Sequence, residues 1–341
     1  MTSIDDVARA SGVSIATVSR ALRGLPNVSE PTRARIRDIA DELGYVASSS
    51  ASGLASGRTL TMGLVAPSVS RWFYTTVIEG VDAALREANY DMILYNLASR
   101  GGDRERVFHR SILRKRTDAL IAVGMDFSGD EREQLLTVGH PLMMIGGPVR
   151  GIRHIGIDEK GVAKTATQHL LDLGHRDIAH LGGDDDEGLN RRVPEDRTTG
   201  FLETTRAAGI TVPSERLLSG HFSLPASRDV MNEVFRRPGP RPTAVFASSD
   251  EMAIGTILAA GDSGIRVPQD LSVIGIDNHD LAASFGLTTM AQDPYEHGER
   301  GARILLSELS GGAQASKTSL KAKAELLVRG STAPPSAPQS N

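Results

Sequence analysis

The pattern of apolar and polar positions divides the 341-residue chain into two parts with different periodicities. Up to about residue 45, apolar residues recur every three or four positions, as they do on the buried face of short helices. From residue 60 onward, short runs of apolar residues alternate with longer segments of helical periodicity. This alternation predicts an α/β fold in which helices cover both faces of parallel sheets.

The second part contains many strand-helix units. Apolar runs of strand length lie at residues 61–66, 91–95, 119–123, 142–145, 152–157, 178–181, 244–247 and 273–276. Segments with helical periodicity lie at residues 74–88, 104–113, 131–138, 160–173, 198–208 and 251–260. This part is too long for one sheet of short strands, so we expect two α/β subdomains. A later helix at 295–309 and a strand at 324–328 predict that the chain crosses between them.

The first twenty or so residues have the pattern of two short helices joined by a tight turn. Ser3 and Asp6 have the spacing of a capping box at the start of the first helix. Gly12 can adopt the positive φ that the corner needs, and Ser14 can cap the second helix. The apolar positions expected to face inward are Ile4, Val7, Ala8, Val13, Val18 and Leu22. The pattern predicts a helix-turn-helix, although two ordinary surface helices would look similar.

A third helix and a basic segment favour the DNA-binding interpretation. Ser29 is a candidate cap for this helix, and Pro31 stands early in it, where a missing N–H costs nothing. Its expected apolar stripe is Ile36, Ile39, Ala40 and Leu43, closed by Gly44. Residues 9–37 hold six arginines against one acid, whereas the whole chain has a net charge of −4. These arginines are Arg9, Arg20, Arg23, Arg33, Arg35 and Arg37. Such a basic patch on an acidic protein is typical of a surface that contacts the phosphate backbone.

At this point the sequence resembles the LacI family of bacterial transcriptional regulators. The residues that carry the resemblance are Asp6-Val7-Ala8, Ala10-Ser11-Gly12-Val13-Ser14, Thr17-Val18-Ser19-Arg20, Val28-Ser29, Thr32-Arg33 and Leu43-Gly44-Tyr45. More loosely, the resemblance extends over residues 3–332. It implies a DNA-binding domain at 1–45, a hinge at 46–59 and an effector-binding and dimerisation core at 60–332. The core would be two-lobed and similar to periplasmic sugar-binding proteins. The proline- and serine-rich residues 333–341 are expected to be a disordered tail.

The resemblance also assigns residues of the head to DNA. Ile15, Ala16 and Arg20 stand where the family contacts base edges. Residues that would touch the backbone or adjacent bases are Thr17, Ser19, Asn27 and Tyr45. Chemically, Arg20 is the strongest base reader, because a guanidinium can bond guanine O6 and N7 together.

Residues 46–59, VASSSASGLASGRT, have the composition of a flexible tether. The resemblance implies instead a short hinge helix that forms on DNA and inserts Leu54 into the minor groove, where such a wedge can kink a base step. The sequence departs from the family pattern, because Ser52 and Gly53 precede Leu54. Glycine costs a helix about 1 kcal/mol relative to alanine, so we expect this hinge to be disordered off DNA.

Candidate effector residues lie near the ends of expected strands, where α/β proteins bind ligands. The resemblance implies that Arg197 and Asp277 bind the effector, that Phe222 packs on it, and that Ser249 and Tyr74 line the site. We expect Arg197 and Asp277 to face one another across the cleft between the lobes. A carboxylate and a guanidinium offer directed hydrogen bonds to neighbouring hydroxyls, and an aromatic ring covers an apolar sugar face.

Other roles for these residues stay open. Asp277 could be a helix cap or part of a salt bridge, and Phe222 could be a plain core residue. Gly146-Gly147 follow the strand after which many family members carry an aspartate. Arg71 replaces the usual small polar residue of its loop, which could equally indicate an anionic effector.

Composition and motifs exclude several other classes of protein. The chain has no cysteine, so a disulfide framework or a thiolate metal site is excluded. It shows no apolar run of membrane-spanning length and no signal-peptide pattern, so we expect a soluble, cytoplasmic protein. No phosphate-binding loop, nucleophile elbow or zinc-protease motif occurs. The acidic residues 184–187 do not fit a calcium loop, because Leu189 stands where glycine is needed. We expect no metal, no cofactor and no catalysis.

Together these patterns predict a homodimeric, DNA-binding transcriptional repressor that a small carbohydrate releases from its operator. The alternatives are a regulator that depends on a co-repressor, with an effector that is not a sugar, and a binding protein without DNA function.

Overall fold

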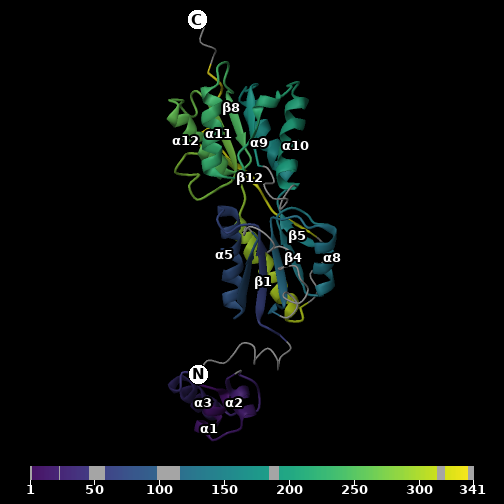
Figure 1. Ribbon diagram of the computed structural model, residues 1–341, viewed down its shortest axis with the longest axis vertical. Helices are drawn as coiled ribbons and strands as arrows, with labels where there is room; N and C mark the ends of the chain where they lie inside the picture. The colour runs from purple at the N-terminus through teal and green to yellow at the C-terminus, as the bar shows by residue number, and fades with distance from the viewer. Residues whose placement is uncertain are drawn as a thin grey trace. The chain divides into compact units, whose positions relative to one another are not determined.

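The computed structural model describes residues 2–22, 24–45, 58–97, 116–183, 192–312 and 319–336. The chain forms two compact units, Met1–Leu60 and Thr61–Asn341 (Figure 1). The expected helix at 104–113 and Leu54 of the hinge lie outside the described residues.

The N-terminal unit is a bundle of three short helices around a small apolar core. The helices are α1 (Ile4–Ser11), α2 (Ile15–Leu22) and α3 (Glu30–Glu42). Val7, Val18 and Ile36 are fully buried where the three helices meet, as the periodicity predicts. Leu43 does not belong to this core: it follows the end of α3 and is 39% exposed.

Local hydrogen bonds explain where these helices begin and end. Both halves of the Ser3–Asp6 capping box form, and Gly12 ends α1 with φ 68° and donates its N–H to Ala8. Ser14 accepts the N–H of Thr17 at 3.2 Å, as a cap of α2 should. Ser29, in contrast, makes no capping bond to the backbone. Its hydroxyl lies 2.7 Å from that of Thr32 instead.

The first lobe of the larger unit is a six-stranded sheet in the order β11-β5-β4-β3-β1-β2, with every pair parallel. Its strands are β1 (Thr61–Ala66), β2 (Asp91–Asn96), β3 (Ala119–Val123), β4 (Leu142–Ile145), β5 (Arg153–Gly156) and β11 (Leu320–Lys321). Its helices are α5 (Trp72–Glu87), α8 (Gly129–Val138) and α13 (Pro294–Leu309). Glycines allow α5 and α13 to touch, because a Cβ on Gly80 would lie 2.1 Å from the carbonyl oxygen of Tyr295.

The second lobe is also a six-stranded sheet, in the order β12-β10-β9-β8-β6-β7. Its strands are β6 (Ile178–Gly182), β7 (Leu217–Ser219), β8 (Ala244–Ala247), β9 (Ser272–Asp277), β10 (Thr288–Ala291) and β12 (Glu325–Leu327). Its helices are α9 (Glu159–Asp172), α10 (Arg192–Ala207), η1 (Ser214–Arg216), α11 (Leu224–Arg236) and α12 (Asp250–Asp262). Figure 1 shows α11 and α12 on one face of this sheet and α9 and α10 on the other. All pairs are parallel except β10 with β12, which is antiparallel.

The chain passes between the lobes three times, and the predicted crossings near 295–309 and 324–328 are among these passages. It leaves the first lobe after β5, returns with α13, and crosses again between β11 and β12. The expected start of a disordered tail at residue 333 is wrong. Ala333 donates its N–H to Ser272 at 3.0 Å and accepts the hydroxyl of Ser272 at 2.9 Å, so this segment is held on the core. Among the described residues, no helix is long and apolar enough to cross a membrane.

Candidate DNA-binding surface and effector site

The outer face of α2 carries the residues predicted to contact base edges. Ile15 is 46% exposed, and Ala16 and Arg20 are also exposed. An exposed isoleucine at the start of a helix leaves apolar surface in water, which is typical of a contact surface. The side chains that could enter a groove therefore point away from the core of the head.

The other predicted DNA contacts have more varied environments. Thr17 is partly buried, and its hydroxyl lies 2.9 Å from that of Ser14. Ser19 is partly buried on α2. Asn27 is exposed in the loop before α3 and has φ 69°, a conformation that asparagine tolerates better than most residues. Tyr45 packs against the core of the head.

One arginine of the basic patch has a structural role. Arg33 is only 9% exposed and donates to the carbonyls of Ala21 at 3.1 Å and Leu25 at 3.0 Å. It also pairs with Glu30 at 3.3 Å. The prediction that Arg33 belongs to a phosphate-contacting patch is therefore wrong, because its guanidinium fixes the loop between α2 and α3. Arg20 and Arg37 remain exposed.

In the second lobe, Arg197 of α10 is buried in an ion pair that sequence reasoning missed. Its Nε and Nη2 lie 2.8 Å and 2.7 Å from the same carboxylate oxygen of Glu159, at the start of α9. Its Nη1 also donates to the carbonyl of Ser248, which follows β8. Burial raises the pKa of Glu159, and the charge of Arg197 opposes that rise. Glu159 looks like an ordinary acid of a first helical turn, so only the tertiary structure identifies it.

Asp277, the last residue of β9, is also buried, at 6% exposure. The amide of Gln292 donates to its Oδ1 at 2.6 Å. Burial is the main cause that raises the pKa of Asp277 to about 8, while the nearby charge of Arg197 lowers it. A carboxyl group in this environment keeps its proton at neutral pH and can donate a hydrogen bond.

The expectation that Arg197 and Asp277 face one another across the cleft is wrong. Both belong to the second lobe, where the charge of Arg197 lies close enough to lower the pKa of Asp277. They form one buried polar cluster together with Glu159, and the described contacts place no residue of the first lobe in it.

The remaining predicted effector residues have identifiable partners. The ring of Phe222 lies against Gly183, where an added Cβ would come within 1.9 Å of it. The guanidinium of Arg71 lies over that ring, 5.8 Å from its centre. Ser249 is the cap of α12 and accepts the N–H of Met252 at 3.3 Å. Tyr74, in the first lobe, donates to the carbonyl of Gly124 at 3.4 Å.

These residues follow strands at the points where strand order reverses. In the second lobe, β7 and β8 lie on opposite sides of β6, and Gly183 and Ser248 follow β6 and β8. In the first lobe, β2 and β3 lie on opposite sides of β1, and Trp72 and Gly124 follow β1 and β3. Open α/β sheets bind their ligands at such points.

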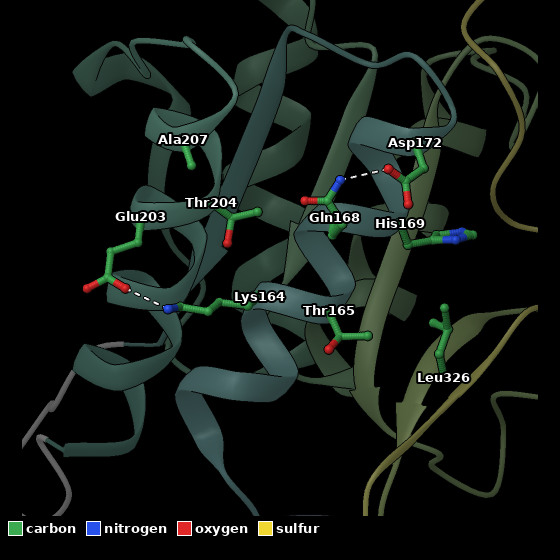
Figure 2. A pocket seen from close by; sticks show the side chains of 9 residues that line it. All are labelled: Lys164, Thr165, Gln168, His169, Asp172, Glu203, Thr204, Ala207 and Leu326. Carbon is green, nitrogen blue, oxygen red and sulfur yellow. Dashed lines mark hydrogen bonds and ion pairs between the residues drawn. The ribbon is translucent and has the colours of Figure 1, made fainter.

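A separate groove of about 710 Å³ lies on the outside of the second lobe (Figure 2). Its lining is Lys164, Thr165, Gln168, His169, Asp172, Glu203, Thr204, Ala207 and Leu326, from α9, α10 and β12. Its polar groups largely pair with one another, as Lys164 does with Glu203 at 2.8 Å. None of the predicted effector residues lines this groove. Within the described ranges, no group of histidine or acidic residues could hold a metal ion.

Comparison with known proteins supports the division into a head and a core. Residues 3–48 match the family model described as bacterial regulatory proteins, lacI family, and residues 167–332 match a periplasmic binding protein-like domain. The chain is 31% identical to the HTH-type transcriptional repressor CytR of Escherichia coli K12 over 335 residues, which covers 96% of this chain and 95% of CytR.

Two solved structures of regulators are similar over most of the chain. The complex of the transcriptional regulator CelR with cellobiose is 28% identical with a TM-score of 0.68, and the match covers 97% of this chain and all of that one. A regulator from Enterococcus faecium with bound ribose is 26% identical with a TM-score of 0.66, over 80% of this chain and 99% of that one.

Proposed function

This chain belongs to the LacI family of bacterial regulatory proteins and is a DNA-binding transcriptional repressor, and on that premise we propose that a small neutral carbohydrate releases it from its operator. The observation that carries the proposal is the buried cluster of Arg197, Glu159 and Asp277, with Phe222 in the same lobe. It combines donors and acceptors suited to hydroxyl groups with an aromatic ring suited to a sugar face.

The distribution of charge favours a neutral effector over an anionic one. Arg197 is paired with Glu159 at 2.7 Å, and the charge of Arg71 is opposed by nearby Glu251. An anion would have to compete with these carboxylates for both cations. The similar regulators with cellobiose and with ribose also hold neutral sugars.

On the DNA side, we infer that Arg20 is the principal base reader and that Ile15 and Ala16 supply apolar contacts. Thr17, Ser19, Asn27 and Tyr45 would position the head on the duplex. Leu54 would act as a minor-groove wedge. A single short recognition helix reads only one half-site, so the functional unit would be a homodimer on a pseudo-palindromic operator.

The test begins with an operator selected from random duplexes by the full-length protein. Operator affinity is then measured by fluorescence anisotropy against a panel of neutral mono- and disaccharides, with sugar acids and sugar phosphates as the contrasting set. We expect a neutral sugar to weaken operator binding, and Asp277→Ala to remove that response without changing the affinity in its absence. Tightening by a sugar would instead establish the co-repressor alternative. A response confined to the anionic set would overturn the proposed effector class.

A further inference from the structure

The chain's only tryptophan joins the two lobes. Trp72, the first residue of α5 in the first lobe, donates its indole N–H to Asp280 of the second lobe at 2.9 Å. Its ring also packs on His279, with centroids 4.9 Å apart and planes tilted by 36°. The two contacts differ in kind. Asp280 is a charged hydrogen-bond acceptor and His279 offers an aromatic ring, and the two residues are consecutive in one loop.

The start of α5 depends on the second lobe in another way. Arg71 occupies the cap position of this helix and makes no capping bond with its side chain. A positive residue at a helix N-terminus opposes the helix dipole and leaves backbone N–H groups without an acceptor. Glu251 of α12 lies near this end of the helix: burial raises the pKa of its carboxyl group, while the charge of Arg71 and the nearby backbone N–H of Trp72 lower it.

The loop that contacts Trp72 begins at a residue of the proposed effector site. Asp277 and Asn278 both have positive φ, 128° and 63°, and the chain then reaches His279 and Asp280. Residues other than glycine rarely hold such angles unless surrounding contacts fix them. The loop is therefore short and constrained between the effector cluster and the contact with Trp72.

Asp250 provides that constraint. It is fully buried and accepts the N–H of His279 at 2.9 Å and the hydroxyl of Thr289 at 2.7 Å, while the same Thr289 oxygen accepts the N–H of Asn278 at 3.3 Å. Asp250 thus holds the amide of His279 directly and that of Asn278 through the hydroxyl of Thr289 on β10. Its own position is fixed by close packing against β9, where a Cβ on Gly275 would lie 2.1 Å from its Oδ1.

We propose that residues 277–280, positioned by Asp250, form a latch that clasps Trp72 and links the state of the effector cluster to the closure of the lobes. The latch goes beyond the proposed function and rests on it only for the role of Asp277. Because Asp250 fixes the loop backbone, a displacement of Asp277 also moves His279 and Asp280 and alters their contacts with Trp72. Glu251, the neighbour of Asp250, stabilises the same end of α5.

The fluorescence of Trp72 reports directly on its contact with the loop, because it is the only indole emission of the full-length protein. Asp280→Ala removes an acceptor on an exposed residue and should leave the fold intact. We expect a red shift of the emission and stronger quenching by acrylamide. Loss of one hydrogen bond should lower the ratio of molecules in which Trp72 contacts the loop to those in which this contact is open by roughly two- to tenfold. The matched control is Asp229→Asn, which changes an exposed carboxylate on α11 of the same lobe.

The role of Asp250 is tested with Asp250→Asn and with Thr289→Val, which removes only one hydroxyl and keeps the side chain's shape. Both should produce the same red shift as Asp280→Ala while the circular dichroism spectrum stays unchanged. In a double-mutant cycle on urea midpoints, Trp72→Phe should be strongly non-additive with Asp280→Ala and additive with Asp229→Asn.

Wild-type emission and quenching in Asp280→Ala, or additivity of that variant with Trp72→Phe, would overturn the latch. If Asp280→Ala responds but neither Asp250→Asn nor Thr289→Val does, Asp250 does not position the loop and the proposal fails at that step. None of these measurements uses an effector, so failure of the carbohydrate proposal would leave their outcome unchanged.

Discussion

Replacing Glu159 by glutamine should destabilise the core far more than its place in an ordinary first helical turn suggests. The carboxylate receives two nitrogens of Arg197, at 2.8 Å and 2.7 Å, and the two side chains are only 8% and 5% exposed. The substitution keeps the shape of the side chain but leaves a buried guanidinium without a counter-charge.

The magnitude follows from the burial of the pair. Removing one partner of a buried ion pair commonly costs about 3–5 kcal/mol, because the other charge stays buried and unpaired. Glutamine keeps one oxygen that can accept from Arg197, and the carbonyl of Ser248 accepts as well. We therefore expect a loss of about 2–4 kcal/mol in the free energy of unfolding. Replacing both partners, as Glu159→Leu with Arg197→Met, should restore most of that loss.

The measurement is urea unfolding of the full-length protein, followed by far-ultraviolet circular dichroism. The control is Glu203→Gln on α10, which removes an exposed acid from bridges to Lys160 and Lys164 and should change stability little. A loss below about 0.5 kcal/mol for Glu159→Gln would refute the reasoning, since changes of that size are typical of surface sites. Additivity of the paired replacement would refute it equally, because uncoupled residues cannot form the pair.

Three further predictions concern the head, the pH dependence and the packing of the first lobe. Arg20→Ala should reduce the binding free energy by about 1–3 kcal/mol on the selected operator and by little on an unrelated duplex. Arg33→Ala should weaken binding to both duplexes equally, because it loosens the fold of the head. Anisotropy titrations with the two duplexes distinguish these outcomes. Burial raises the pKa of Asp277 from its ordinary value of 3.8 to about 8. Between pH 3.8 and about 8, the folded state therefore keeps a proton that the unfolded state has released. The free energy of unfolding should accordingly fall as the pH rises through that window. Melting temperatures of the wild type should therefore decline from pH 5 to 8 relative to Asp277→Asn, and parallel curves would contradict this. Gly80→Ala should destabilise the first lobe by about 1–3 kcal/mol, because its Cβ would lie 2.1 Å from the carbonyl oxygen of Tyr295, and an unchanged urea midpoint would count against the close contact.

Strands that are buried on both faces could be read directly from the sequence. The predicted runs at 61–66, 119–123, 142–145 and 244–247 coincide with β1, β3, β4 and β8, because a continuous apolar run between turn residues has few other structures. In contrast, β10 was not predicted. Thr288 and Thr289 of β10 are polar but fully buried, and they are tolerated there through hydrogen bonds to Thr332 and Asp250. The sequence shows that these two threonines are polar, but it does not show which groups they bond to.

The candidate site could be predicted only in part, for a similar reason. Resemblance to a family pointed to Arg197 and Asp277, yet it did not reveal that Glu159 already neutralises Arg197. The two residues are 38 positions apart, and no periodicity connects them. The two-sided arrangement expected of Arg197 and Asp277 was wrong because α10, which carries Arg197, packs on the same sheet as β9, which carries Asp277, and spacing does not encode which elements share a lobe.

The position of the buried ionisable groups is consistent with the proposed binding role. An apolar cluster in place of Glu159, Arg197 and Asp277 would avoid the cost of desolvating ionisable groups, so their presence calls for another explanation. They lie where β8 and β9 end, next to the reversal of strand order between β6 and β8, which is where open α/β sheets admit ligands. The first lobe repeats this geometry with the loops after β1 and β3, and the loop after β1 carries Trp72 to His279 and Asp280. Because Asp277 and Asp280 belong to one short loop, the proposed latch would pass a displacement of Asp277 by a ligand to the contact between the lobes. On this proposal, a ligand that contacts only the second lobe can still shift the equilibrium between the open and closed arrangements of the two lobes.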